Sequence, residues 1–250
     1  MKSNEYPNFL IEYRERIRKG EIIAGHELTD ELDRLIEDLE DPRYIYDTTE
    51  AYERMDFMEN CVRLTKEPFY NQPMKLMLWQ KAFIEVMYSF KMAEDGFERF
   101  KKIVLLIARK NTKSETCAAL ALSELILGVP GNDIVCSSND DNQASIVYDA
   151  IDLMRSLIDP EDLDTKRNQR YILNKITNTK VTKLSDRTRN KEGRNIGFAI
   201  VDETHEMKTN IIAKSIEQSQ SLKNNPKFIN ITTEGFVNEG YLDDELKKCR

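Results

Sequence analysis

The spacing of hydrophobic positions changes near residue 100 of this chain. Before it, apolar residues recur every three or four positions, as in 27–39, which is typical of an amphipathic helix. Thr29 or Asp30 is placed to cap this helix. Similar patterns predict helices over 48–64 and 74–92, and no strand is predicted in this part of the chain.

After residue 100, short apolar runs alternate with helical patterns. The runs at 103–108 and 197–202 are continuous, as in strands buried on both faces of a parallel sheet. This alternation predicts an α/β fold with a mainly parallel central sheet flanked by helices, and with ligands at the carboxyl ends of the strands. We expect a helical N-terminal region over 1–95 and an α/β core over 96–250. The other expected strands are 133–137, 171–173, 180–184 and 228–232, and the expected helices are 115–127, 144–157 and 205–222.

Composition narrows the class of protein without giving a function. The 250 residues are 40% hydrophobic with a formal net charge of −7, as in ordinary globular proteins. No apolar run reaches the roughly 18 residues of a membrane span, and we expect no secretory signal or membrane partner. The four cysteines share no CxxC spacing and the chain has two histidines, so neither a disulfide framework nor a zinc site is expected.

Charge is distributed unevenly along the chain. Residues 21–60 carry fourteen acids and three bases, which is typical of a solvated face. Residues 166–195 carry ten bases and two acids. Because this basic block comes shortly before an acidic motif, its side chains are candidates for contacting the phosphates of a nucleotide or a nucleic acid.

A candidate phosphate-binding loop follows the first apolar run. It reads Ala108-Arg-Lys-Asn-Thr-Lys-Ser114 and leads directly into a predicted helix. In a Walker A loop the helix N-terminus and the lysine bind phosphates, and the serine hydroxyl binds Mg²⁺. Ile107 and Thr112 stand where the GxxxxGK[ST] pattern has glycine. A Lys-Ser pair at a helix start is also common without any nucleotide.

A candidate Walker B motif ends the second continuous run. Asp202 at the strand end is placed to hold Mg²⁺, and Glu203 to orient and deprotonate a water molecule. Two acids at this point also suit the N-terminus of a following helix. Thr232 and Thr233 end the next predicted strand, either as sensors of the terminal phosphate or as part of a plain turn with Gly235.

These segments together resemble the ATPase domain of the large terminase subunit of tailed bacteriophages, over most of the chain from about residue 57. The resemblance implies a RecA-like P-loop NTPase with a helical N-terminal subdomain. The segments that carry it are Leu78-Trp-Gln80, Phe97-Glu-Arg-Phe100, the loop at 107–114, Gly193, Ala199-Ile-Val-Asp-Glu-Thr-His-Glu206 and Thr232-Thr-Glu-Gly235.

The resemblance also implies roles for individual residues. Gln80 would contact adenine beside Trp79, which also suits a core position. Arg109 would contact phosphate and assist catalysis, and Glu203 would be the catalytic carboxylate. His205 and Glu206 match the family as well, and we expect them either to support the catalytic groups indirectly or to be structural. The remaining implied roles are nucleotide binding by Lys110, Asn111, Thr112, Lys113 and Ser114; Mg²⁺ binding by Ser114 and Asp202; coupling by Thr232 and Thr233; and a trans-acting arginine among Arg187, Arg189 and Arg194.

The implied activity is ATP hydrolysis that drives double-stranded DNA into a procapsid. The implied partners are the portal protein, the small terminase subunit and further copies of the chain in a ring. The expected location is the host cytoplasm, transiently at the portal, and not the mature virion. No nuclease activity is expected, because no nuclease-like acidic cluster follows the core. The alternatives are a helicase-like DExH ATPase and, because of Thr112, a non-hydrolysing terminase assembly module.

Overall fold

The computed structural model describes residues 7–138, 141–184, 195–207, 210–233 and 240–249. They form two compact units, one made of Met1–Glu59 and Lys75–Phe100, the other of Asn60–Met74 and Lys101–Arg250. The second unit therefore includes a short segment taken from the N-terminal part of the chain. Among the described residues, no helix has the length and apolar character needed to cross a membrane.

The first unit contains four helices and a small sheet in its described part: α1 (Phe9–Arg18), α2 (His26–Glu37), α3 (Thr49–Asn60), α4 (Leu78–Ser89), β1 (Tyr44–Tyr46) and β2 (Phe90–Met92). The prediction that this part lacks strands was wrong, because β1 and β2 pair antiparallel. Each has three residues, which is too short for an alternating pattern to be recognised. Phe90 of β2 joins Leu10, Leu32 and Leu35 in the core of this unit.

Helix boundaries in this unit differ from the predicted ones. The N-cap of α2 is Gly25, so neither Thr29 nor Asp30 caps it. The hydroxyl of Thr29 instead donates to the carbonyl of Gly25 from inside the first turn. The predicted helix over 74–92 is shorter at both ends, since α4 begins at Leu78 and the chain continues into β2.

The second unit contains a seven-stranded sheet in the order β3-β9-β8-β4-β7-β6-β5. The first five strands are parallel, while β6 pairs antiparallel with β7 and β5 with β6. This confirms the predicted mainly parallel α/β sheet. Its strands are β3 (Lys102–Leu106), β4 (Asp133–Ser138), β5 (Thr165–Arg167), β6 (Tyr171–Asn174), β7 (Lys180–Leu184), β8 (Ile196–Asp202) and β9 (Lys227–Thr232).

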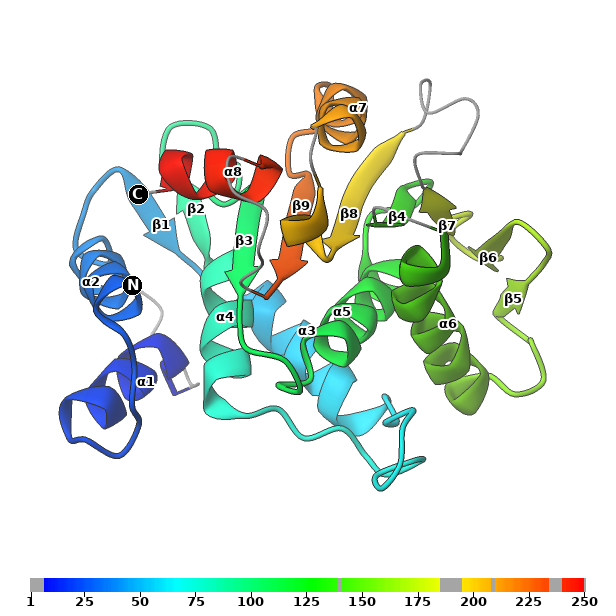
Figure 1. Cartoon of the computed structure of the whole chain (residues 1–250), viewed down its shortest axis with the longest axis horizontal. Helices are drawn as coiled ribbons and strands as arrows, with labels where there is room; N and C mark the ends of the chain where they lie inside the picture. The colour runs from blue at the N-terminus through cyan, green and yellow to red at the C-terminus, as the bar shows by residue number, and fades with distance from the viewer. Residues whose placement is uncertain (1–6, 139–140, 185–194, 208–209, 234–239, 250) are drawn as a thin grey trace. The chain divides into compact units, whose positions relative to one another are not determined.

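Helices cover both faces of this sheet. Figure 1 shows α5 (Lys113–Leu127) and α6 (Asp141–Ile158) on one side and α7 (Ile211–Gln220) and α8 (Tyr241–Cys249) on the other. Every residue of β8 is buried. Ala199 and Val201 pack against Ile212 of α7 and Tyr241 of α8, and strand alternation turns Phe198 and Ile200 to the opposite face. The continuous apolar run of β8 therefore reflects helices on both sides.

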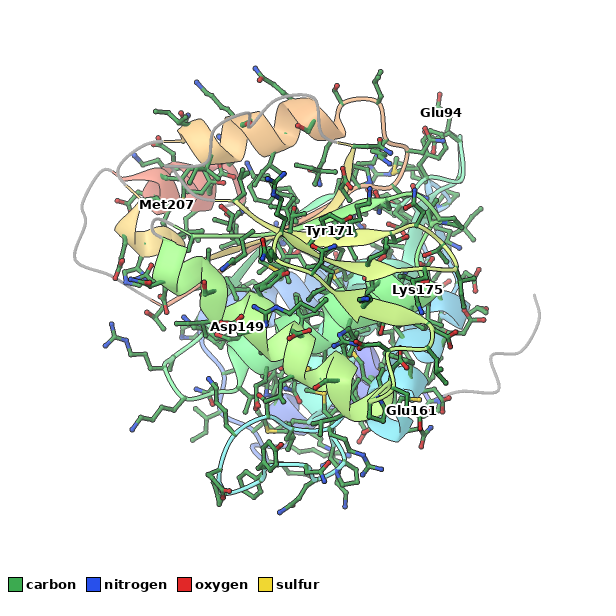
Figure 2. All side chains as sticks on the ribbon, turned by 90° about the vertical axis from the view of Figure 1, so that its right-hand side faces the viewer. Glu94, Asp149, Glu161, Tyr171, Lys175 and Met207 are labelled. Carbon is green, nitrogen blue, oxygen red and sulfur yellow. The ribbon has the colours of Figure 1, made fainter. Side chains whose placement is uncertain are left out.

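Three features of this unit depart from the predicted pattern. The run at 103–108 contributes to the edge strand β3, whose residues are half-buried except for the exposed Leu106. The polar stretch 205–222 is not one helix, because the 3-10 turn η1 (Thr204–Glu206) precedes α7. The short strand β5 and the helices α1 and α8 were not predicted. In Figure 2 the end of the sheet with Tyr171 and Lys175 faces the viewer, beside α6 with Asp149.

Candidate nucleotide-binding site

The loop between β3 and α5 has the backbone form of an anion-binding turn. Lys110 and Thr112 have positive φ angles of 66° and 56°. Thr112 is the left-handed N-cap of α5, so left-handed and right-handed residues alternate at its junction with Lys113. Such alternation directs successive N–H groups into a concavity that binds anions, and the positive end of the helix dipole adds to it.

Side chains in this loop separate into exposed and buried groups. Arg109, Lys110, Asn111 and Thr112 are exposed, whereas Lys113 is buried. The side-chain amide of Asn111 donates to the carbonyl of Ala108 and closes the turn. The predicted phosphate contacts of Arg109 and Lys110 stay predictions.

Thr112 occupies a conformation that favours glycine. A β-branched residue at positive φ is a backbone outlier, and the left-handed region costs an L-residue roughly 1–2 kcal/mol. Thr112→Gly should therefore raise the free energy of unfolding by about 0.5–1 kcal/mol after the larger chain entropy of glycine is subtracted. It should also tighten ATP binding, because the Cβ and its branches no longer restrict the approach of phosphate.

Urea unfolding and calorimetric titration with ATP test this prediction. Thr112→Ala is the matched control: it removes the branch but keeps Cβ, and should leave stability within about 0.5 kcal/mol. Weaker ATP binding by Thr112→Gly would contradict the assignment of this loop to phosphate.

The phosphate loop meets a cluster of acidic side chains at the carboxyl end of β8. Lys113 Nζ lies 3.0 Å from Glu203 Oε1 and 3.9 Å from Asp202 Oδ1. The hydroxyl of Ser114 donates to Asp202 Oδ2 at 3.3 Å. The structure thus brings together the four residues that two separate motifs predicted, although β9 lies between β3 and β8 in the sheet.

The oxygen atoms at this point suit Mg²⁺. A serine hydroxyl and a carboxylate oxygen lie side by side, and magnesium prefers a few such ligands completed by water and phosphate. The other oxygen of Asp202 accepts from the backbone N–H of Glu203 at 2.8 Å, which fixes the orientation of the carboxylate. No group of three or more His, Cys, Asp or Glu side chains that would hold a metal by itself occurs among the described residues.

Burial raises the pKa of Asp202 from 3.8 to about 6; the charge of Glu203 adds to this effect, while Lys113 and Ser114 oppose it. A raised carboxyl pKa means that the folded protein favours the protonated form. The contribution of Asp202 to stability is therefore full below about pH 4 and is lost as the pH rises through about 6.

Asp202→Asn should therefore stabilise the metal-free protein by about 1–3 kcal/mol near neutral pH and by much less near pH 4. Urea unfolding of the two proteins at both pH values measures this difference. An equal gain at both pH values would show that the charge of Asp202 is not its cause. The same substitution should weaken Mg²⁺-dependent nucleotide binding.

Glu203 is held in a strained backbone conformation, with φ 52° and ψ 45°. Residues in such conformations cluster at functional sites, where the surrounding structure stabilises them. One neighbour is His205, whose Nδ1 lies 3.1 Å from Glu203 Oε2. Thr232 at the end of β9 lies beside the same imidazole, and the buried hydroxyl of Thr233 has no hydrogen-bond partner among the described residues.

The roles predicted for several other residues are not tested by this cluster. Trp79 and Gln80 belong to α4 in the other unit, where the buried Gln80 accepts a hydrogen bond from Met77 N at 2.7 Å. Their contact with adenine stays a prediction. Arg187, Arg189 and Arg194 lie outside the described residues, so the trans-acting role proposed for one of them stays a prediction as well.

Two polar contacts of the site were not predicted. The hydroxyl of Ser138, on β4, donates to the carbonyl of Asp202 at 3.0 Å and joins the ends of two adjacent strands. Gln143 of α6 donates to Glu206 at 2.9 Å. The contact of Ser138 could have been predicted, because this serine stands at the carboxyl end of a predicted parallel strand. The contact of Gln143 with Glu206 could not, because it depends on how α6 packs in the tertiary structure.

A segment from the N-terminal part of the chain also reaches α5. The backbone N–H and hydroxyl of Thr65 donate to Glu115 Oε1 at 3.0 and 2.8 Å. Glu115 directly follows Ser114, so this contact supports the first turn of α5. The backbone N–H of Leu64 donates to the carbonyl of Gln72, and that of Asn71 donates to the carbonyl of Leu64, which closes the segment into a hairpin-like loop.

Three solved structures are similar to this chain, and the first of them supports the fold. The large terminase of bacteriophage HK97 is 25% identical, with a TM-score of 0.68 over 80% of this chain and 42% of its own. The large terminase ATPase domain of Thermus phage P74-26 is 19% identical, covering 55% and 61% of the two chains with a TM-score of 0.47. The N-terminal domain of the DNA packaging ATPase of bacteriophage phi29 is 15% identical, covering 59% and 80% with a TM-score of 0.40.

The chain therefore spans less than half of the HK97 protein, and no curated protein sequence matches it. The model of the family described as "Terminase large subunit, ATPase domain" matches residues 78–250, which include the phosphate loop, both acids and the end of β9. Because this match covers more than half of the chain, the chain belongs to the family of terminase large subunit ATPase domains.

Proposed function

We propose that this chain hydrolyses ATP to drive double-stranded viral DNA into a procapsid. The observation that carries the proposal is the contact of Lys113 with Glu203 at 3.0 Å beside that of Ser114 with Asp202 at 3.3 Å. A cation for phosphate, two oxygen ligands and a carboxylate base then meet at one end of the sheet, as phosphoryl transfer to water requires.

The roles of the residues follow from this arrangement. The N–H groups of the loop and the ammonium of Lys113 bind the β- and γ-phosphates, with Arg109, Lys110 and Asn111 at the outer side of the loop. Ser114 and Asp202 would hold Mg²⁺, which neutralises the charge that develops on the phosphates. Glu203 accepts a proton from the attacking water.

The buried state of Glu203 Oε2 supports its role as the base. This oxygen makes no hydrogen bond with any residue that the structure describes, although His205 Nδ1 lies 3.1 Å from it, whereas Oε1 lies 3.0 Å from Lys113. A buried acceptor without a partner is costly unless water or substrate fills the site. The geometry therefore leaves one carboxylate oxygen available for water after phosphate draws Lys113 away from the other.

The remaining parts of the proposal concern partners. Thr232 and Thr233 transmit the loss of phosphate, Trp79 and Gln80 contact adenine, and an arginine of a neighbouring copy completes the site in a ring. DNA, the portal protein and the small terminase subunit are the other partners, met in the host cytoplasm and at the procapsid portal.

The basic block at 166–195 is not wholly available for phosphates. Within it, Arg167 already forms ion pairs with Asp149 and Asp152 of α6.

The test is ATP hydrolysis measured over a range of protein concentrations, with and without double-stranded DNA. The rate per molecule should rise with concentration, because a trans-acting arginine contributes up to about 10³–10⁵-fold in related chemistry. ATP binding without any turnover would favour the non-hydrolysing assembly module instead. DNA unwinding would favour the helicase-like alternative.

A further inference from the structure

His205 lies between the predicted catalytic carboxylate and the end of β9. Its Nδ1 lies 3.0 Å from the hydroxyl oxygen of Thr232 and 3.1 Å from Glu203 Oε2. Its backbone N–H also donates to the Thr232 hydroxyl, at 3.1 Å. The side chain is 9% exposed or less, so both contacts are screened from water.

The hydrogen bonds around Thr232 favour one tautomer of the imidazole. The hydroxyl of Thr232 has one hydrogen, which it donates to the carbonyl of Thr233 at 2.9 Å. With its hydrogen on that carbonyl, the hydroxyl oxygen is free to accept from His205, and this arrangement suits a ring that carries hydrogen at Nδ1. A hydrogen at Nδ1 would also face Glu203 Oε2, 3.1 Å away, so both neighbours suit the same tautomer.

Thr232 also forms a backbone hydrogen bond with the start of the phosphate loop. The backbone N–H of Ile107 donates to the carbonyl of Thr232 at 3.1 Å, because β3 and β9 are adjacent. A continuous path of contacts therefore runs from Ile107 through Thr232 and His205 to Glu203. It reaches the carboxylate at Oε2, the side opposite to Lys113.

We propose that His205 is a positioning residue for ATP hydrolysis, which keeps Glu203 in its strained conformation and makes its position depend on Thr232. This inference rests on the proposed ATPase function. The imidazole takes no proton from the reacting groups. Its ring holds Oε2 near the attacking water, and a displacement of the phosphate loop or of β9 moves the ring and therefore the base.

Steady-state kinetics of His205→Ala and His205→Asn test the proposal. His205→Ala should lower kcat about 10²-fold, the cost of misplacing a catalytic group by about 1 Å, with KM changed less than about twofold. Asn places an amide N–H near the position of Nδ1, so His205→Asn should recover about tenfold of this loss. The double variant with Thr232→Val should be no slower than His205→Ala, since both act through one contact.

The controls separate this inference from the proposed function. His26 is the other histidine of the chain and lies exposed in the first unit, so His26→Ala should retain the full kcat. If the unaltered protein lacks turnover, both the function and the inference are wrong. If the unaltered protein turns over and His205→Ala retains its kcat, or loses affinity and kcat together without recovery by Asn, the positioning role alone is wrong.

A second measurement is independent of turnover. Nitrogen-15 spectra of the imidazoles in the unaltered protein and in His26→Ala assign the His205 ring, since the chain has two histidines. The expected result is a ring that carries hydrogen at Nδ1. A ring protonated at Nε2 alone would leave Nδ1 unable to donate to Thr232 and would overturn the arrangement.

Discussion

Replacing Glu203 with glutamine is expected to lower kcat for ATP hydrolysis about 10³-fold and to leave ATP binding intact. Glutamine has the volume of glutamate, but its amide cannot take a proton from water. The carboxylate, whose buried Oε2 has no hydrogen bond with the described residues and lies 3.1 Å from His205 Nδ1, would become an amide that cannot act as a base. Affinity should rise or stay constant, because removal of this charge lowers the repulsion between the site and the phosphates.

Single-turnover hydrolysis and calorimetric titration measure the two effects separately. Glu206→Gln is the matched control, since Glu206 lies in the same turn but accepts a hydrogen bond from Gln143. Its kcat should stay within about threefold of the unaltered value. If Glu203→Gln also kept its kcat within about threefold of the unaltered value, the base would have to be another residue.

Lys113→Ala is expected to reduce kcat/KM by at least about 10³-fold, through loss of both affinity and rate. The ammonium is buried and is the cation nearest to Asp202 and Glu203 among the described contacts. Without it, phosphates approach two carboxylates that no lysine offsets, and the pKa of Asp202 rises further because an opposing charge is gone.

Lys214→Ala, at an exposed lysine of α7, is the matched control and should retain full activity. Lys113→Arg should recover little of the loss, because a planar guanidinium does not replace a compact ammonium in a closed phosphate loop. Hydrolysis that is unchanged in Lys113→Ala would contradict the assignment of the whole site.

The buried centre of the sheet was the most predictable part of the fold. β8 is covered on both faces, so its residues are uniformly apolar and the run at 197–202 marks it clearly. The same reasoning made the run at 103–108 look equally buried, yet β3 is an edge strand. Apolar runs report local composition, whereas the order of strands is set by tertiary contacts that are distant in sequence.

Only part of the candidate site could be predicted from the sequence. Lys113, Ser114, Asp202 and Glu203 follow strand ends in the expected order, so their convergence follows from a parallel sheet. The contact of His205 with Thr232 depends on β9 lying between β3 and β8, which chain order does not reveal. The start of α1 could have been predicted, because asparagine is a favoured N-cap residue and the side chain of Asn8 accepts a hydrogen bond from Ile11 N.

The loop Asn60–Met74 bears on how this protein can be divided. The chain passes from the first unit to the second at Glu59, returns at Lys75 and passes again after Phe100. A gene fragment that starts at Lys101 would encode every strand of the large sheet and still lack Thr65, the partner of Glu115. Truncation from the N-terminus should therefore weaken the start of α5 before it removes any part of that sheet.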